Sequence, residues 1–70
     1  GELKAAASLY EEALRLDVKS AKAWLNLAKV RKSMNEPRAL EAVQEVLRLQ
    51  PKNRRALRLQ DELKNSSGPK

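Results

Sequence analysis

Apolar side chains recur at three- and four-residue steps along four stretches of the chain, which is the spacing of one face of an α-helix. The first stretch covers about residues 2–16, and the other three follow short polar segments at residues 17–20, 35–37 and 51–53. Connections this short force successive helices to pack antiparallel. The pattern therefore predicts an all-α fold of about four helices arranged as antiparallel hairpins.

Capping and turn residues stand at the ends of these predicted helices. Ser20 and Asn53 precede the second and fourth stretches, where a side-chain oxygen can accept a hydrogen bond from a free backbone amide. Pro37 suits the first turn of the third helix, where its missing amide has no intrahelical partner, and Pro51 ends that helix. Asn35 stands at the second turn and tolerates a left-handed backbone conformation.

The expected inward-facing residues share one helical face in each stretch. They are Leu3, Ala6, Leu9, Tyr10, Ala13 and Leu14, then Ala21, Trp24, Leu27, Ala28 and Met34, then Ala39, Leu40, Val43, Val46 and Leu47, and finally Ala56, Leu59 and Leu63. An aromatic residue on an apolar stripe is more often part of the core than a ligand contact. Trp24 and Tyr10 are therefore expected to pack between helices.

The chain also repeats itself at an interval of 33 residues. This shift superimposes Ala6, Glu12, Leu14, Arg15, Leu16, Lys19 and Ala23 on Ala39, Glu45, Leu47, Arg48, Leu49, Lys52 and Ala56. A fixed period of this size is typical of stacked helical units, none of which can bury its apolar face alone.

The residues of the central unit resemble a tetratricopeptide repeat (TPR). Ala23-Trp24, Leu27-Ala28, Ala39 and Pro51 stand where that family has its helix A anchor, its small-residue contact, its helix B alanine and its closing proline. The resemblance covers residues 1–64: the second half of a repeat (1–19), one full repeat (20–53), and a capping or next-repeat helix (54–64). It implies right-handed superhelical stacking, and it leaves residues 65–70 as a disordered tail.

Several features depart from the family pattern. Asn35 replaces the usual turn glycine, and the unit is one residue shorter than the usual period of about 34. Val18 replaces the usual proline after the first helix, and Leu59 and Gln60 break the register with Leu27, which is why the fourth helix resembles a terminal cap. Since asparagine tolerates a left-handed turn, the first departure keeps the predicted fold intact.

Composition excludes several kinds of chemistry. The sequence has no Cys and no His, which excludes disulfides, thiolate nucleophiles, Cys/His zinc sites and histidine bases. Glu11 with Arg15 is expected to form an i,i+4 ion pair, and Glu41 with Glu45 an exposed like-charged pair rather than a catalytic one. We expect neither an enzyme nor a bound metal or cofactor, and no membrane span. The lack of cysteine fits a cytoplasmic protein.

Charge is divided between the predicted helices. The net charge is −2 over residues 1–17, +5 over residues 18–35, −1 over residues 36–50 and +4 over residues 51–70. In the TPR fold, helices equivalent to the second and fourth line a concave groove. The resemblance therefore implies a basic groove, with Lys32 on the same face as the five candidate contacts: Lys22, Asn26, Lys29, Arg55 and Arg58. An acidic peptide or a chain-terminal carboxylate is the expected ligand, and the chain a scaffold or adaptor.

Asn26 connects the chain to one branch of the family. In TPR co-chaperones, an asparagine in the setting Trp24-Leu25-Asn26-Leu27-Ala28 binds the terminal carboxylate of heat-shock chaperone tails ending in Glu-Glu-Val-Asp. Arg55 matches the position of a clamp lysine, whereas Leu59 stands where the clamp has arginine, with Arg58 one residue early. The other clamp residues would precede residue 1, so the resemblance implies a partial clamp. Asn26 as an ordinary solvated residue remains an equal interpretation.

Two alternatives stay open. The basic helices could contact RNA, although aromatic side chains for base stacking are nearly lacking and the first and third stretches are acidic. The chain could instead be a structural, terminal piece of a longer solenoid. Its first helix would then lack a partner, which leaves part of the Leu3, Ala6 and Leu9 stripe uncovered and favours weak self-association.

Overall fold

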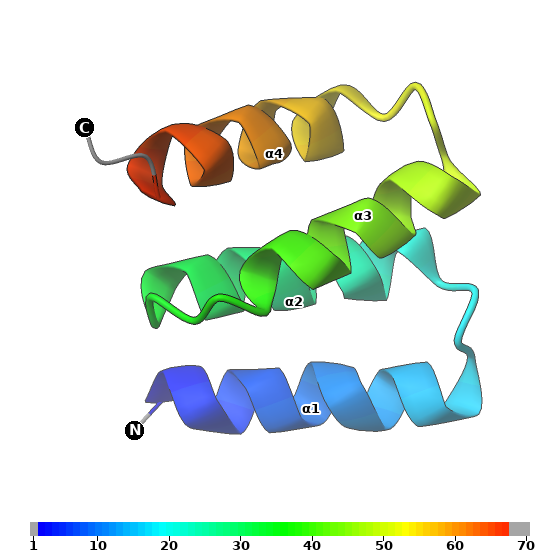
Figure 1. The fold of residues 1–70 in the computed structure, drawn as a ribbon. Coiled ribbons are helices and arrows are strands. Elements are labelled where there is room, and N and C mark those ends of the chain that lie inside the picture. The colour runs from blue at the N-terminus through cyan, green and yellow to red at the C-terminus, as the bar shows by residue number, and fades with distance from the viewer. Residues whose placement is uncertain (1, 68–70) are drawn as a thin grey trace.

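The computed structural model describes residues 2–67, which form four α-helices: α1 (Glu2–Leu16), α2 (Ala21–Ser33), α3 (Ala39–Leu49) and α4 (Arg54–Ser67). Successive helices run in opposite directions, so α2 and α4 run parallel to one another (Figure 1). The all-α prediction is confirmed. The helix α4 extends through residues 65–67, which were expected in a disordered tail, and residues 68–70 lie outside the described part.

Helix α2 is the centre of the fold. It packs against α1, α3 and α4, and α3 also packs against α4, whereas α1 contacts only α2 within the described chain. The helices therefore form an open stack with α1 at one end and α4 at the other (Figure 1). Each end helix has one face that the described chain does not cover.

Two apolar clusters hold this stack together. The larger joins α2, α3 and α4 and consists of Ala21, Leu25, Ala28, Ala42, Val43, Val46, Ala56 and Leu59. The smaller joins α1 and α2 and consists of Ala7, Leu14, Ala23 and Leu27. Ala28, Ala42 and Ala56 are fully buried, and small side chains at these positions allow the helices to approach closely.

The two aromatic residues lie between helices, as expected. Trp24 contacts both clusters, and its indole Nε1 donates a 2.8 Å hydrogen bond to the carbonyl oxygen of Val18. Tyr10 packs against the α1–α2 cluster. The prediction that both side chains serve packing is confirmed.

The predicted helix ends are largely confirmed. The side-chain oxygens of Ser20 and Asn53 accept hydrogen bonds from the amides of Ala23 and Ala56, at 3.2 and 3.0 Å. Asn35 has a φ of 58°. Its own amide donates a hydrogen bond to the Lys32 carbonyl, and the amide of Glu36 donates to the Arg31 carbonyl, which together form a Schellman motif at the end of α2.

Two local predictions need correction. Pro37 lies in the turn before α3 rather than in its first helical turn, because that helix begins at Ala39. The apolar stripe of α1 is wider than the surface that α2 covers. Leu3 and Leu9 are therefore 43% and 70% exposed, and Ala13 is exposed, although all three were expected to face inward.

No helix within residues 2–67 is long and apolar enough to cross a membrane.

Candidate functional site

A basic groove lies between the parallel helices α2 and α4. This hollow of about 390 Å³ is lined by Lys29, Lys32, Ser33, Arg55, Arg58, Leu59 and Glu62. Four of these side chains are basic and one is acidic. The lining residues of α4 recur at three- and four-residue steps beside its buried stripe, while those of α2 follow directly after buried Ala28. The packing of α4 on α2 thus brings the two sets together.

One ion pair crosses the basic groove. Lys32 Nζ lies 2.6 Å from Glu62 Oε1, and the two side chains are 37% and 46% exposed. The hydrogen bond and charge of Lys32, with a smaller contribution from Arg58, lower the pKa of Glu62 below its ordinary value of 4.5. Because both partners reach solvent, the pair contributes little to stability.

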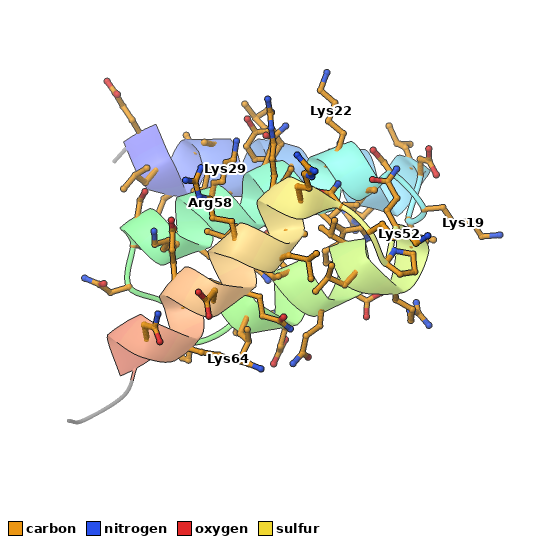
Figure 2. The ribbon with its side chains drawn as sticks, turned by 90° about the horizontal axis from the view of Figure 1, so that it is seen from above. Lys19, Lys22, Lys29, Lys52, Arg58 and Lys64 are labelled. Carbon is orange, nitrogen blue, oxygen red and sulfur yellow. The ribbon has the colours of Figure 1, made fainter. Side chains whose placement is uncertain are left out.

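Two other basic residues of the groove have no acidic partner in the described chain. Neither Lys29 nor Arg55 forms an ion pair within the described chain. Figure 2 shows Lys29 of α2 next to Arg58 of α4. The groove therefore presents uncompensated positive charge above an apolar floor, since Leu59 is only 7% exposed.

The structure brings together three of the five predicted contacts. Lys29, Arg55 and Arg58 line the basic groove, whereas Lys22 and Asn26 do not. Lys22 is exposed and extends away from the helices (Figure 2), and Asn26 is half-buried on α2. The equivalence of Lys22 with Arg55 in the repeat therefore does not place both in one hollow.

The position of Lys22 along α2 keeps it out of the basic groove. The α2 residues that line the groove are Lys29, Lys32 and Ser33, all in the C-terminal half of that helix. Lys22 is the second residue of α2 and therefore lies at the other end of the helix.

Two further lining residues, Lys32 and Glu62, carry different sequence signals. Lys32 follows Lys29 by three residues on the same helical face, where the sequence already placed it, and it lines the groove. Glu62 carried no such signal, because it is an acidic residue within a basic segment and its role depends on Lys32.

A second hollow, of about 610 Å³, lies over α2 between α1 and α3. Its lining residues are Glu11, Leu14, Arg15, Val18, Trp24, Leu27, Arg31, Arg38, Glu41, Gln44 and Glu45. Acidic and basic groups are equal in number here, and each charged lining residue forms an ion pair, within the hollow or with a neighbour on its own helix. This hollow therefore presents no excess charge to a ligand.

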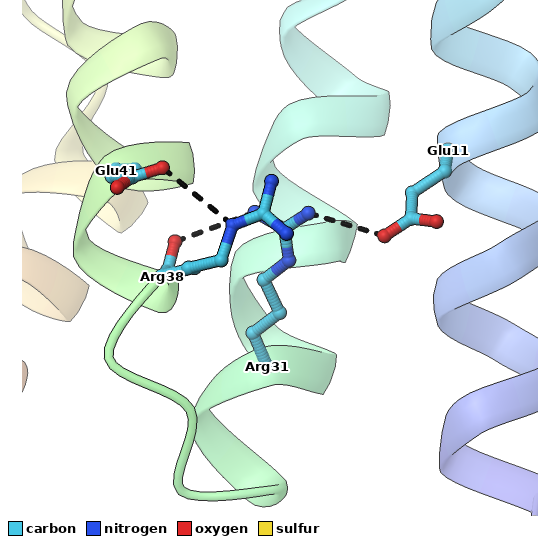
Figure 3. Close-up of polar contacts among 4 residues, drawn as sticks. All are labelled: Glu11, Arg31, Arg38 and Glu41. Carbon is cyan, nitrogen blue, oxygen red and sulfur yellow. Dashed lines mark hydrogen bonds and ion pairs between the residues drawn. The ribbon is translucent and has the colours of Figure 1, made fainter.

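Arg31 is the buried charge of this second hollow (Figure 3). Its side chain is 5% exposed, and Nη2 lies 3.2 Å from Glu11 Oε2 while Nη1 donates to the Arg38 carbonyl at 3.4 Å. The predicted Glu11–Arg15 pair is wrong, because the buried guanidinium of Arg31 takes Glu11. Arg15 pairs instead with Glu12, at 3.2 Å.

The carboxylates on α3 are also paired with arginines. Glu41 lies 3.7 Å from Arg38 Nε, and Glu45 lies 2.9 Å from Arg48 Nη2. Each is therefore one half of an i,i+3 ion pair on the surface. Residues 2–67 contain no group of three or more acidic side chains that could hold a metal ion.

Comparison with protein-family models, with curated proteins and with solved structures finds no match to this chain.

Proposed function

We propose that this chain is a protein-interaction module whose basic groove holds an acidic segment of a partner protein. The observation that carries this proposal is the convergence of Lys29, Lys32, Arg55 and Arg58 on one hollow, with Glu62 as the single acidic lining residue. A concave surface of one charge sign attracts the opposite sign and speeds its association. Carboxylates are the protein groups that lysine and arginine bind through charge-assisted hydrogen bonds.

The same proposal assigns the helices to TPR roles, with α2 and α4 as inner, groove-lining helices and α1 and α3 as outer ones. Support comes from the parallel course of α2 and α4 and from the central position of α2. The 33-residue repeat supports it independently.

We propose acidic segments in general as ligands, rather than heat-shock chaperone tails in particular. Leu59 stands at the position of the second clamp cation, and its side chain belongs to the buried core. Asn26 does not line the groove. Binding that depends on a free terminal carboxylate would restore the chaperone-type interpretation.

RNA is a weaker candidate for the same groove. Base stacking on aromatic rings supplies much of the affinity for single strands. Trp24 and Tyr10 pack at α1 and α2 and do not line the groove, so they offer no stacking surface there.

Calorimetric titration tests the proposal. The probe is the acetylated octapeptide Gly-Ser-Glu-Glu-Glu-Glu-Ala-Ala, compared with its amidated twin and with a version in which glutamine replaces each glutamate. We expect both acidic peptides to bind, with affinity that falls as ionic strength rises, and the glutamine version not to bind. The double variant Lys29→Glu, Arg58→Glu should lose at least about tenfold in affinity.

The double variant Lys19→Glu, Lys52→Glu is the matched control, because it reverses the same number of charges in the turns before α2 and α4, at residues that do not line the groove (Figure 2). If the control loses as much affinity for the acidic peptide as the groove variant, the loss reflects the net charge of the protein and not the groove. No binding of any acidic peptide by the wild type, or tighter binding of an oligonucleotide such as oligo(U), would overturn the proposal.

A specific observation favours a second candidate function, helix packing through α1. An outer stripe of α1, defined as Ala5, Leu9, Ala13 and Leu16, is exposed along the whole helix. Leu9 and Leu16 are 70% and 86% exposed, which is unusual for two leucines on one face. We propose that this stripe supports weak self-association.

A further inference from the structure

The basic groove already contains a carboxylate of its own. Glu62 is the one acidic residue among its lining residues, and it contacts Lys32 from the opposite helix. Two of the ion pairs in the described chain join different helices. Arg31–Glu11 has a buried guanidinium, whereas both partners of Lys32–Glu62 are open to solvent.

We propose that Glu62 occupies the carboxylate-binding position of the groove in the free protein, and that an acidic side chain of the ligand displaces it from Lys32. This inference rests on the proposed function. It adds Lys32 as the cation that receives the incoming carboxylate, and Glu62 as the residue that limits affinity and selects acidic ligands.

The geometry marks where the ligand carboxylate goes. Glu62 Oε1 sits 2.6 Å from Lys32 Nζ, which is a charge-assisted hydrogen bond of favourable length. Arg58 precedes Glu62 by one helical turn, and its charge also favours the ionised carboxylate. A ligand carboxylate at the same point meets the same two cations, with Lys29 and Arg55 further along the groove.

Displacement needs no change in the fold. Lys32 and Glu62 are each more than a third exposed, so side-chain rotation alone separates them. An exposed ion pair of this kind contributes little to stability, so little is lost when it opens. An acidic ligand therefore replaces the Lys32–Glu62 ion pair with an ion pair between Lys32 and its own carboxylate. A neutral ligand leaves Lys32 paired with Glu62 and gains no binding energy at this position.

The test compares Glu62→Gln with Asp61→Asn. Both changes remove one negative charge from adjacent positions on α4, but Asp61 does not line the groove. With the same glutamate octapeptide, we expect Glu62→Gln to bind about fivefold more tightly than wild type and Asp61→Asn to change affinity by less than about twofold. Adding Lys32→Gln to Glu62→Gln should abolish most of the gain.

A second readout follows Glu62 itself. In a carbon-detected NMR titration of the side-chain carboxyl, the pKa of Glu62 is expected below 4.5 in the free protein and closer to 4.5 with saturating peptide, because Lys32 then serves the ligand. Glutamine is tolerated at an exposed helical position, and circular dichroism of the variant checks its helix content.

The outcomes separate the two proposals. If the wild type binds the octapeptide but Glu62→Gln gains no affinity, or Asp61→Asn gains equally, the displacement model is overturned and the groove remains the binding site. An unchanged Glu62 pKa in the complex would also overturn displacement. If neither the wild type nor Glu62→Gln binds any acidic peptide, both proposals fail.

Discussion

Single residues decide the local geometry of this small chain, and their predictability differs. Asn35 shows a case that the sequence reveals, because asparagine is one of the few residues that accept a left-handed conformation at a helix end. Arg31 shows the opposite case. Its position on the apolar stripe of α2, four residues after Leu27 and three before Met34, is compatible with burial, but no sequence signal pairs it with Glu11, which is 20 residues away in the sequence.

Asn35 provides the first prediction. Replacement by alanine places a Cβ-bearing residue without a compensating polar side chain at a φ of 58°, so Asn35→Ala should lower the free energy of unfolding by about 1 kcal/mol. Asn35→Gly should match or exceed the wild-type stability because glycine adopts this conformation freely. Urea denaturation followed by circular dichroism measures both. Equal stability of the alanine and glycine variants would contradict this explanation of the turn.

The neighbouring residues Glu11 and Glu12 provide a matched pair. Glu11→Ala leaves the buried guanidinium of Arg31 with the Arg38 carbonyl alone, and we expect a loss of about 1–2 kcal/mol, because Glu11 is half exposed and solvent screens part of the effect. Glu12→Ala removes only an exposed pair with Arg15 and should change stability by less than about 0.5 kcal/mol. Thermal denaturation in parallel compares the two. Similar losses would show that the Arg31 contact has no special weight.

At the scale of elements, the four helices and their order follow from the apolar spacing, while their relative placement does not. The period of the apolar positions predicts each helix, and Ser20 and Asn53 predict two of the starting points. The sequence repeat predicted Lys22 as a groove contact together with Arg55. In the structure the hollow opens beside the C-terminal half of α2, so Lys22, at the start of that helix, does not line it.

The Lys32–Glu62 contact between α2 and α4 predicts a pH dependence. Because the folded pKa of Glu62 lies below its ordinary value of 4.5, this pair stabilises the fold above pH 4.5, and the contribution is lost as pH falls through the lowered value. The wild type should therefore lose stability more steeply than Glu62→Gln below pH 4.5. Chemical denaturation between about pH 2 and pH 6 measures the difference in the free energy of unfolding between the two proteins. This range extends about two pH units to either side of the expected titration of Glu62.

High salt is the control for this pH dependence. Both partners are exposed, so 1 M salt, with a Debye length of about 3 Å, should reduce the difference between wild type and Glu62→Gln. Identical pH profiles at low salt would mean that the pair does not form in solution.

At the scale of the whole molecule, the open stack gives the chain two distinct surfaces. The groove between α2 and α4 is basic, and the outer stripe of α1 is apolar. The segregation of charge by helix predicted the first surface from the sequence. On the second surface, Leu9 was predicted to face the core but Leu16 was not. Periodicity alone does not show how much of a wide apolar stripe the next helix covers.

The outer stripe of α1 predicts self-association. Leu9→Glu with Leu16→Glu should shift sedimentation at millimolar protein concentration towards a single monomeric species, since two charges then oppose apolar contact between copies. Leu57→Glu is the control, because Leu57 is a partly exposed leucine on α4, at the other end of the stack. Wild-type protein that sediments as a monomer throughout would contradict self-association.

The most direct test of the basic groove as the functional surface is a map of backbone amide shifts during titration with the glutamate octapeptide. We predict saturable changes that centre on Lys29, Lys32, Ser33, Arg55, Arg58, Leu59 and Glu62. Saturable changes centred instead on the hollow between α1 and α3, around Trp24 and Arg31, or no saturable change at all, would contradict it.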